Sequence, residues 1–218
     1  MIINIAHQKG GVGKSTLATN LAVAMKGDIL DLDSQHSCLL FSRLREDSGL
    51  GKIAVHTADT VDELKEIVGS YNGEKTLIID SGGYDNEINR TSLYLSDIIL
   101  TPVGPAQIEI FGLKKFSSIL ENVTTKLQQS SGRSDISLRS NVIINNADPR
   151  SQGAIGELKE YIVANSKWFD LLESVLHART DYKRAYGQGK SVEELKAGSK
   201  AGEELQSLVK DIKSVIAF

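Results

Sequence analysis

Short apolar runs alternate with longer amphipathic stretches along this chain of 218 residues. The apolar runs predict buried strands at 2–6, 29–33, 75–80, 98–102 and 141–145, with shorter candidates at 53–55 and 175–176. Helical spacing predicts helices at 16–25, 38–45, 61–68, 108–127 and 153–163, and a mostly helical segment at 191–218. Continuous apolar strands that alternate with helices are typical of a parallel sheet covered on both faces. We therefore predict a three-layer α/β fold with a mostly parallel twisted sheet, formed by residues 1–218 as a single domain.

Polar residues gather where the predicted strands end. The ends of successive strands carry a glycine-rich stretch at 10–15, then Asp31 with Asp33, Asp80, Pro102, and Asn145 with Asn146. The carboxyl ends of parallel strands meet at one edge of a sheet, and ligands of such sheets bind there. The sequence therefore predicts one binding site at this edge.

The most specific motif is the stretch Gln8-Lys9-Gly10-Gly11-Val12-Gly13-Lys14-Ser15-Thr16, between the first predicted strand and the first helix. Glycines let backbone N–H groups surround an anion, and a helix N-terminus adds partial positive charge. In such a phosphate-binding loop, residues Gly10 to Thr16 contact the nucleotide, Lys14 reaches the terminal phosphates and the Ser15 hydroxyl binds Mg²⁺. Gln8 stands where the usual pattern has its first glycine, and Lys9 adds a second cation.

The stretch K-G-G-V-G-K-S-T resembles the deviant Walker A box of the ParA/MinD ATPases, and the resemblance extends over essentially the whole chain. It implies the P-loop NTPase fold, ATP and Mg²⁺ as ligands, and an ATP-sandwich homodimer. In that dimer Lys9 reaches across to the nucleotide of the partner. The alternative for Lys9 is a solvated loop lysine.

Asp80 ends an apolar strand, as a Walker B aspartate does, and is predicted to hold Mg²⁺ through water. The alternative is a carboxylate that caps the turn before Gly82 and Gly83. The family usually has D-x-P-P or D-x-P-G here, whereas this chain has Asp80-Ser81-Gly82-Gly83. The response of this segment to a γ-phosphate is therefore not carried over from the resemblance.

The segment Asp31-Leu32-Asp33-Ser34-Gln35 resembles the D-x-D-x-Q segment of the same family. The resemblance implies that Asp33 positions the attacking water and that Asp31 assists in the magnesium shell. Strand alternation is expected to place both carboxylates on one side of the strand end. The alternative is a pair of carboxylates that bind loop amides.

Asn145 ends the predicted strand at 141–145, and Asn146 follows it. An asparagine amide offers both a donor and an acceptor to an adenine edge, and the resemblance assigns this role to Asn145. Asn146 as the adenine contact, or an Asx-turn before Pro149, are the alternatives. The segment Pro102-Val103-Gly104-Pro105 resembles the P-x-x-P that follows strand five in the family, and it is predicted to shape the site and the dimer face.

Residues 177–192 form the most basic segment. It holds four cationic side chains and one aspartate, a net charge of +3 with histidine neutral. The cations are Arg179, Lys183, Arg184 and Lys190. ParA-type partition ATPases have a comparable segment that binds DNA without sequence preference, so the resemblance implies salt-sensitive DNA contacts here. A solvated surface turn is the alternative. Tyr182 and Tyr186 are predicted to pack rather than to stack on bases.

Composition narrows the choice of function. The net charge of −3 and a pI near 5.8 argue against a protein coated in basic residues. The single cysteine, Cys38, excludes an internal disulfide framework and a zinc cluster, and a reducing cytoplasm is expected. No apolar run approaches the ~18 residues of a membrane span, and no signal peptide is expected at the N-terminus. The apolar stripe that ends at Phe218 is accompanied by both acidic and basic residues, which favours packing over membrane anchoring.

Taken together, these features predict a weak partition ATPase, cytoplasmic and nucleoid-associated. Its ATP-bound homodimer is expected to bind DNA non-specifically, and a ParB-like or other centromere-binding adaptor on the cargo is expected to stimulate hydrolysis. The chain starts in the first predicted strand, so no N-terminal DNA-binding domain is expected. A MinD-like membrane-associated ATPase is the alternative.

Overall fold

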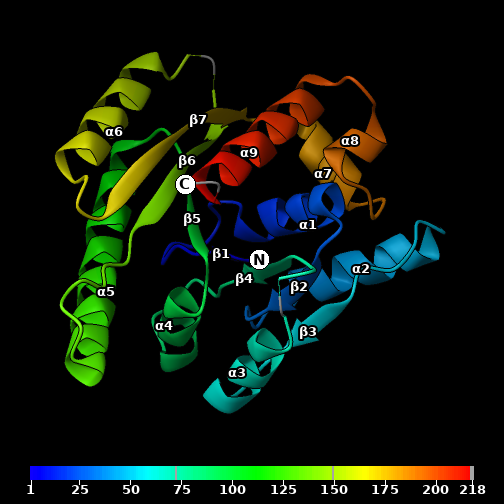
Figure 1. Cartoon of the computed structure of the whole chain (residues 1–218). Coiled ribbons are helices and arrows are strands. Elements are labelled where there is room, and N and C mark those ends of the chain that lie inside the picture. Colours follow the sequence, from blue (N-terminus) through cyan, green and yellow to red (C-terminus); the bar gives the residue numbers. More distant parts are fainter. Residues whose placement is uncertain (72, 149, 217–218) are drawn as a thin grey trace.

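The structure is a computed structural model that describes residues 1–71, 73–148 and 150–216. One seven-stranded sheet has the order β3-β2-β4-β1-β5-β6-β7, and neighbouring strands are parallel (Figure 1). The strands are β1 Ile2–Ile5, β2 Asp28–Asp31, β3 Val55–Thr57, β4 Leu77–Asp80, β5 Ile98–Val103, β6 Ser140–Ala147 and β7 Phe169–His177. The central strands β1, β2, β4 and β5 are buried along their whole length, which explains why they are apolar runs without alternation.

Helices cover both faces of the sheet, as the sequence predicts (Figure 1). They are α1 Lys14–Met25, α2 Ser37–Asp47, α3 Val61–Gly69, α4 Glu87–Tyr94, α5 Gln107–Ser131, α6 Gln152–Ala164, α7 Thr180–Tyr186, α8 Val192–Leu195 and α9 Lys200–Ile216. Helices α1, α2, α7, α8 and α9 share one apolar core with the sheet. Helices α3 to α6 pack on the other face through two further cores. The α/β prediction is confirmed. Among the described helices, none has the length and apolar character needed to cross a lipid bilayer.

Several boundaries differ from those predicted, and three of them change the site. Strand β2 ends at Asp31, so Asp33 lies in a turn and strand alternation does not orient it. Strand β6 continues to Ala147 because it pairs with a nine-residue β7, so Asn146 as well as Asn145 lies within the strand. Strand β5 ends at Val103 rather than at Pro102, so the first two residues of the P-x-x-P segment lie inside the sheet. Pairing with the neighbouring strand of the sheet decides these ends.

The C-terminal region also differs from its prediction. The segment predicted as mostly helical is divided into α8 and α9 around Gly198, whose φ is +66°. Helix α4, which was not predicted, begins with the Asn86 side chain accepting a hydrogen bond from the backbone N–H of Asn89. The predicted packing of Phe218 lies outside the described residues.

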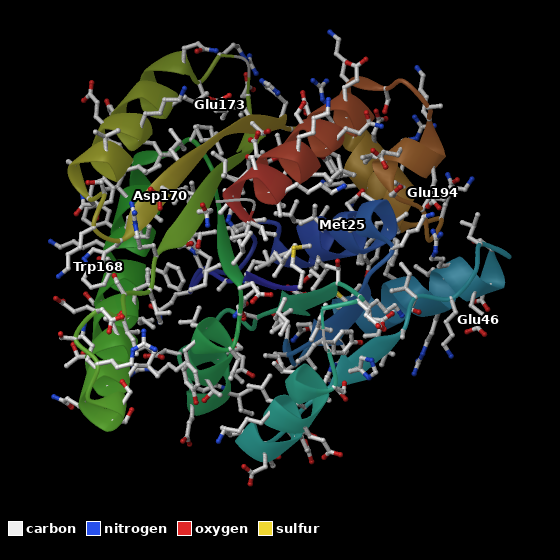
Figure 2. The ribbon with its side chains drawn as sticks, in the orientation of Figure 1. Met25, Glu46, Trp168, Asp170, Glu173 and Glu194 are labelled. Atoms are coloured by element: carbon white, nitrogen blue, oxygen red, sulfur yellow. The ribbon has the colours of Figure 1, made fainter. Side chains whose placement is uncertain are left out.

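The loop before α8 packs closely on α2. Arg45 of α2 donates hydrogen bonds to both carboxylate oxygens of Glu194 on α8, at 2.7 and 2.8 Å, and one to the carbonyl oxygen of Gly189 at 3.0 Å. The Glu194 side chain is labelled in Figure 2. Gly189 has φ +63°, and a Cβ there would clash with the backbone nitrogen of Arg45. This close approach fixes the neighbouring basic segment against α2.

Candidate active site

The glycine-rich loop, Gln8 to Gly13, connects the end of β1 to the start of α1. Gly11 and Gly13 have φ values of +78° and +95°, in the left-handed region that favours glycine. Gly13 is also the N-cap of α1, so the loop leads directly into the first turn of a 12-residue helix. The geometry combines exposed loop backbone at Gly10 and Gly11 with a helix N-terminus, which is the arrangement that binds phosphate.

Lys14 is the cation at the centre of this loop. The residue is only 6% exposed, and its Nζ donates a hydrogen bond to the carbonyl oxygen of Lys9 at 3.2 Å. Burial lowers the pKa of Lys14, and the charges of Asp80 and Asp33 oppose that shift. Gly83 lies alongside, where an added Cβ would be 3.6 Å from the Lys14 Nζ. The Gly82–Gly83 segment therefore lies against the glycine-rich loop, an arrangement that the sequence did not predict.

Asp80 provides the clearest candidate for a metal ligand. It is fully buried at the end of β4, and its Oδ1 has no hydrogen-bond partner among the described residues. Its Oδ2 accepts a hydrogen bond from the Cys38 thiol at 3.3 Å. Burial raises the pKa of Asp80 to about 6, while the Ser15 hydroxyl, the Cys38 thiol and Lys14 act in the opposite direction. A buried carboxylate oxygen without a partner, beside a serine hydroxyl, fits the oxygen ligands that Mg²⁺ prefers.

Asp31 and Asp33 have different partners, although the sequence treats them as a pair. The Asp31 carboxylate accepts hydrogen bonds from the backbone N–H groups of Asp33, Cys38 and Leu39, at 3.1, 3.0 and 3.3 Å. It therefore anchors the first turn of α2, as the loop-amide alternative predicts. Asp33 also accepts a hydrogen bond from a loop amide, the backbone N–H of Gln35 at 3.0 Å, as the same alternative predicts. Of the two, Asp33 keeps a carboxylate oxygen for other contacts. Its negative charge also raises the pKa of Lys14, against the effect of burial.

Lys9 forms an ion pair within its own chain. Its Nζ lies 2.5 Å from Oε1 of Glu109, in the first turn of α5. His7 accepts a hydrogen bond from the backbone N–H of Lys9 through Nδ1 at 2.9 Å. Burial, together with the charges of Lys14 and Lys9, lowers the pKa of His7 to about 4, so the imidazole is neutral at pH 7.

Sequence reasoning missed both His7 and Glu109. A signal for Glu109 was present, since it shares the buried stripe of α5 with Leu113, Phe116 and Leu120 at helical spacing. A carboxylate on an apolar stripe indicates a buried partner.

Asn145 reaches the glycine-rich loop from β6. Its Nδ2 donates to the carbonyl oxygen of Val12 at 2.7 Å, which leaves its Oδ1 for a ligand. Asn146 has φ +55° and is exposed. Both line a cavity of about 280 Å³ beside the loop, together with Thr16, Tyr182 and others. The Asx-turn in this segment is made by Asp148, whose carboxylate accepts from the backbone N–H of Arg150, and Pro149 lies outside the described residues.

The four basic side chains of residues 177–192 are not equivalent. Arg179 donates to the Glu204 carboxylate of α9 through Nε and Nη2, and His177 contacts the same carboxylate. Lys183 and Arg184 of α7 are exposed, and Lys190 is half-buried. The structure therefore leaves Lys183 and Arg184 as the accessible cations of this segment.

The two tyrosines of α7 pack, as predicted. Tyr186 donates a hydrogen bond to the carbonyl oxygen of Ser37 at 2.7 Å, and its ring lies 5.6 Å from that of Phe41. Tyr182 packs on the same core, and its hydroxyl is buried without a partner among the described residues.

Comparisons with known proteins agree with this geometry. A family model described as the CobQ/CobB/MinD/ParA nucleotide binding domain matches residues 3–192. By sequence, the chain is similar to maintenance of carboxysome distribution protein A of Halothiobacillus neapolitanus, with 21% identity over 214 residues, 95% of this chain and 94% of the relative. By structure, it is similar to a Cyanothece McdA variant in complex with ATP (TM-score 0.67, 17% identity, 97% and 96% of the two chains). It is also similar to a plasmid partition protein of Borrelia burgdorferi (TM-score 0.67, 17% identity, 99% of both chains). At these identities the structural likeness shows the fold.

Proposed function

The chain belongs to the CobQ/CobB/MinD/ParA nucleotide-binding domain family, and on this premise we propose that it is a positioning ATPase of the ParA/MinD type. It binds ATP with Mg²⁺, forms an ATP-sandwich dimer, binds DNA non-specifically and hydrolyses ATP slowly until a cargo-bound adaptor stimulates it. The observation that carries the proposal is the buried Asp80, which lies near Ser15 and Lys14 and whose Oδ1 has no hydrogen-bond partner among the described residues.

The residues have distinct roles in this mechanism. Backbone N–H groups of Gly10 to Lys14 bind the phosphates, and the Lys14 ammonium neutralises the terminal phosphates. Ser15 and Asp80 would hold Mg²⁺, which when bound stabilises the charge that develops on the transferring phosphoryl group. Asp33 orients the attacking water with its remaining carboxylate oxygen.

Slow basal hydrolysis follows from the state of Lys9. In the single chain the Lys9 ammonium is paired with Glu109 of the same chain. Each nucleotide site therefore lacks the second cation until the Lys9 of a partner reaches it in the ATP-sandwich dimer. Extra positive charge at a transferring phosphoryl group accelerates its transfer. We expect the dimer, and above all the adaptor-bound dimer, to be the hydrolysing species.

DNA binding is assigned to the exposed cations of α7. Lys183 and Arg184 are exposed, and two copies in a dimer would double the number of phosphate contacts. The adaptor is a cargo-bound protein of the ParB type, or a functional equivalent on a protein assembly such as the carboxysome, whose distribution a relative maintains.

The deciding experiment measures retention on non-specific DNA with ATP, with ADP and without nucleotide, at low and moderate salt. We expect retention only with ATP and weaker retention as salt rises. Lys14→Ala serves as the nucleotide-free control, since loss of this ammonium should abolish ATP binding. ATP-dependent dimerisation without DNA retention would refute the DNA role and direct the search to a membrane surface.

A further inference from the structure

We propose that Glu109 is a positioning residue for Lys9. It holds the Lys9 ammonium against its own subunit in the single chain and releases it when two ATP-bound copies associate. The inference rests on the proposed dimer, in which Lys9 serves the nucleotide of the partner, and it adds the residue that governs when Lys9 is free to do so.

The ion pair is close and partly shielded from water. Lys9 Nζ and Glu109 Oε1 are 2.5 Å apart, and the side chains are 37% and 9% exposed respectively. The second carboxylate oxygen of Glu109 is buried and has no partner among the described residues. No other ion pair of Glu109 is found in the part of the chain that the structure describes. Lys9 is therefore the counter-charge on which this buried carboxylate depends.

Hydrogen bonds hold the backbone of Lys9 in place, whereas its side chain is free to exchange Glu109 for another partner. Its N–H donates to His7 Nδ1 at 2.9 Å, and its carbonyl oxygen accepts from Lys14 Nζ at 3.2 Å. His7 in turn lies against α5, where a Cβ added to Gly112 would be 2.9 Å from the imidazole Cε1. Because the loop and α5 are in direct contact, a change of partner by Lys9 requires rotation of its side chain rather than movement of the loop.

Release of Lys9 has an energetic cost that opposes association. It would leave a carboxylate that is mostly buried with neither oxygen paired, and an unpaired buried charge is strongly unfavourable. Exposed apolar residues flank Glu109 on the same turn of α5, since Ile108 is 60% and Phe111 is 65% exposed. A second copy that covers this surface would gain apolar burial while Lys9 changes partner. The ion pair thus restrains association without preventing it.

The test compares Glu109→Gln with Glu121→Gln. Glu121 lies on the same helix, in an exposed and longer pair with Lys167 at 3.9 Å, so its substitution makes the same charge change where no restraint is proposed. Association with ATP is measured by sedimentation over a range of protein concentrations. We expect Glu109→Gln to dimerise at about tenfold lower concentration than the unmodified chain, and Glu121→Gln to match the unmodified chain.

Two further readouts separate positioning from a general structural effect. The acetylation rate of the Lys9 amine, measured by mass spectrometry without nucleotide, should rise several-fold in Glu109→Gln and stay unchanged in Glu121→Gln. In a Lys9→Ala background, Glu109→Gln should no longer change the association constant.

The outcomes distinguish this inference from the function on which it rests. If the unmodified chain dimerises with ATP and Glu109→Gln dimerises at the same or higher concentration, the positioning role is overturned and the proposed function stands. The positioning role is also overturned if the effect of Glu109→Gln persists without Lys9. If the unmodified chain stays monomeric with ATP at every concentration, the proposed dimer fails and this inference fails with it.

Discussion

Asn145 Nδ2 donates a hydrogen bond of 2.7 Å to the carbonyl oxygen of Val12, across 133 positions of sequence. The bond joins β6 to the glycine-rich loop just before α1. A Cβ on Gly13 would lie 2.5 Å from the same Nδ2, so the asparagine and the loop fit closely. Asn145 therefore supports the shape of the phosphate site, whichever contact its Oδ1 makes with a base.

Replacing Asn145 with alanine should weaken ATP and GTP binding by the same factor, about fivefold, because one hydrogen bond that orders the loop is worth roughly 1 kcal/mol. Nucleotide titrations measure both affinities. Asn141→Ala is the matched control, since Asn141 also lies on β6 and donates to a backbone carbonyl, that of Ile99, away from the loop. A loss confined to ATP would instead indicate the adenine contact predicted from the family resemblance.

Replacing Asp33 with alanine should give a dimer that forms with ATP and does not turn over. Among the described residues, the Asp33 carboxylate makes one hydrogen bond, to a turn amide, so its removal should disturb the fold little. Loss of a water-orienting group, in contrast, typically costs at least about a hundredfold in rate. Phosphate release and sedimentation with ATP are the measurements. Asp47→Ala, at the exposed end of α2, controls for the loss of charge. A variant that remains monomeric with ATP would show that Asp33 acts before hydrolysis.

Replacing Asp80 with asparagine should stabilise the nucleotide-free chain at neutral pH. The pKa of Asp80 in the fold is about 6, above its ordinary 3.8, so this carboxyl favours folding below pH 4, and that contribution is lost as pH rises through 6. The free energy of unfolding of the variant should therefore exceed that of the unmodified chain by up to ~3 kcal/mol above pH 7, and the difference should shrink toward pH 4.

Denaturant unfolding from pH 4 to 8 tests this expectation. His7 is retained in both chains, so its own titration cancels in the difference. With ATP and Mg²⁺ the order should reverse, because only the unmodified chain keeps the metal ligand. A difference that does not vary with pH would contradict a raised Asp80 pKa.

Reversing charge at both Lys183 and Arg184 should strongly weaken DNA retention while ATP-dependent dimerisation remains. Retention assays at several salt concentrations should also show a smaller salt dependence, by about one in slope for each phosphate that is no longer neutralised. Lys65→Glu with Lys159→Glu changes the charge equally on α3 and α6, on the other face of the sheet, and should leave DNA retention intact. Arg179 is a poor choice for this test, because its reversal would also break the ion pair with Glu204. Equal loss in both double variants would point to a diffuse charge effect.

The family resemblance and the strand pattern predicted a mostly parallel sheet and the edge at which the site lies, but not the order of the strands. These features depend on local signals: apolar runs become strands buried on both faces, and glycines tolerate the left-handed backbone that the loop requires. The same signals predicted Lys14, Ser15 and Asp80 at one edge of the sheet, and the structure shows that β1, which precedes the glycine-rich loop, pairs with β4, which ends at Asp80.

The sequence by itself thus determined the fold class, the glycine-rich loop and the identity of the candidate catalytic groups. Only the tertiary structure decided which of these side chains are already hydrogen-bonded or ion-paired within the chain. Asp31 binds amides of α2 while Asp33 does not, Arg179 is paired with Glu204, and Lys9 is paired with Glu109 at a separation of 100 positions. The physical reason is that local propensity specifies an element and its exposed face, whereas the partner of a charged side chain is set by packing between elements distant in sequence. The same charged residue can be solvated in one tertiary fold and ion-paired in another, and the sequence around it does not distinguish these two environments.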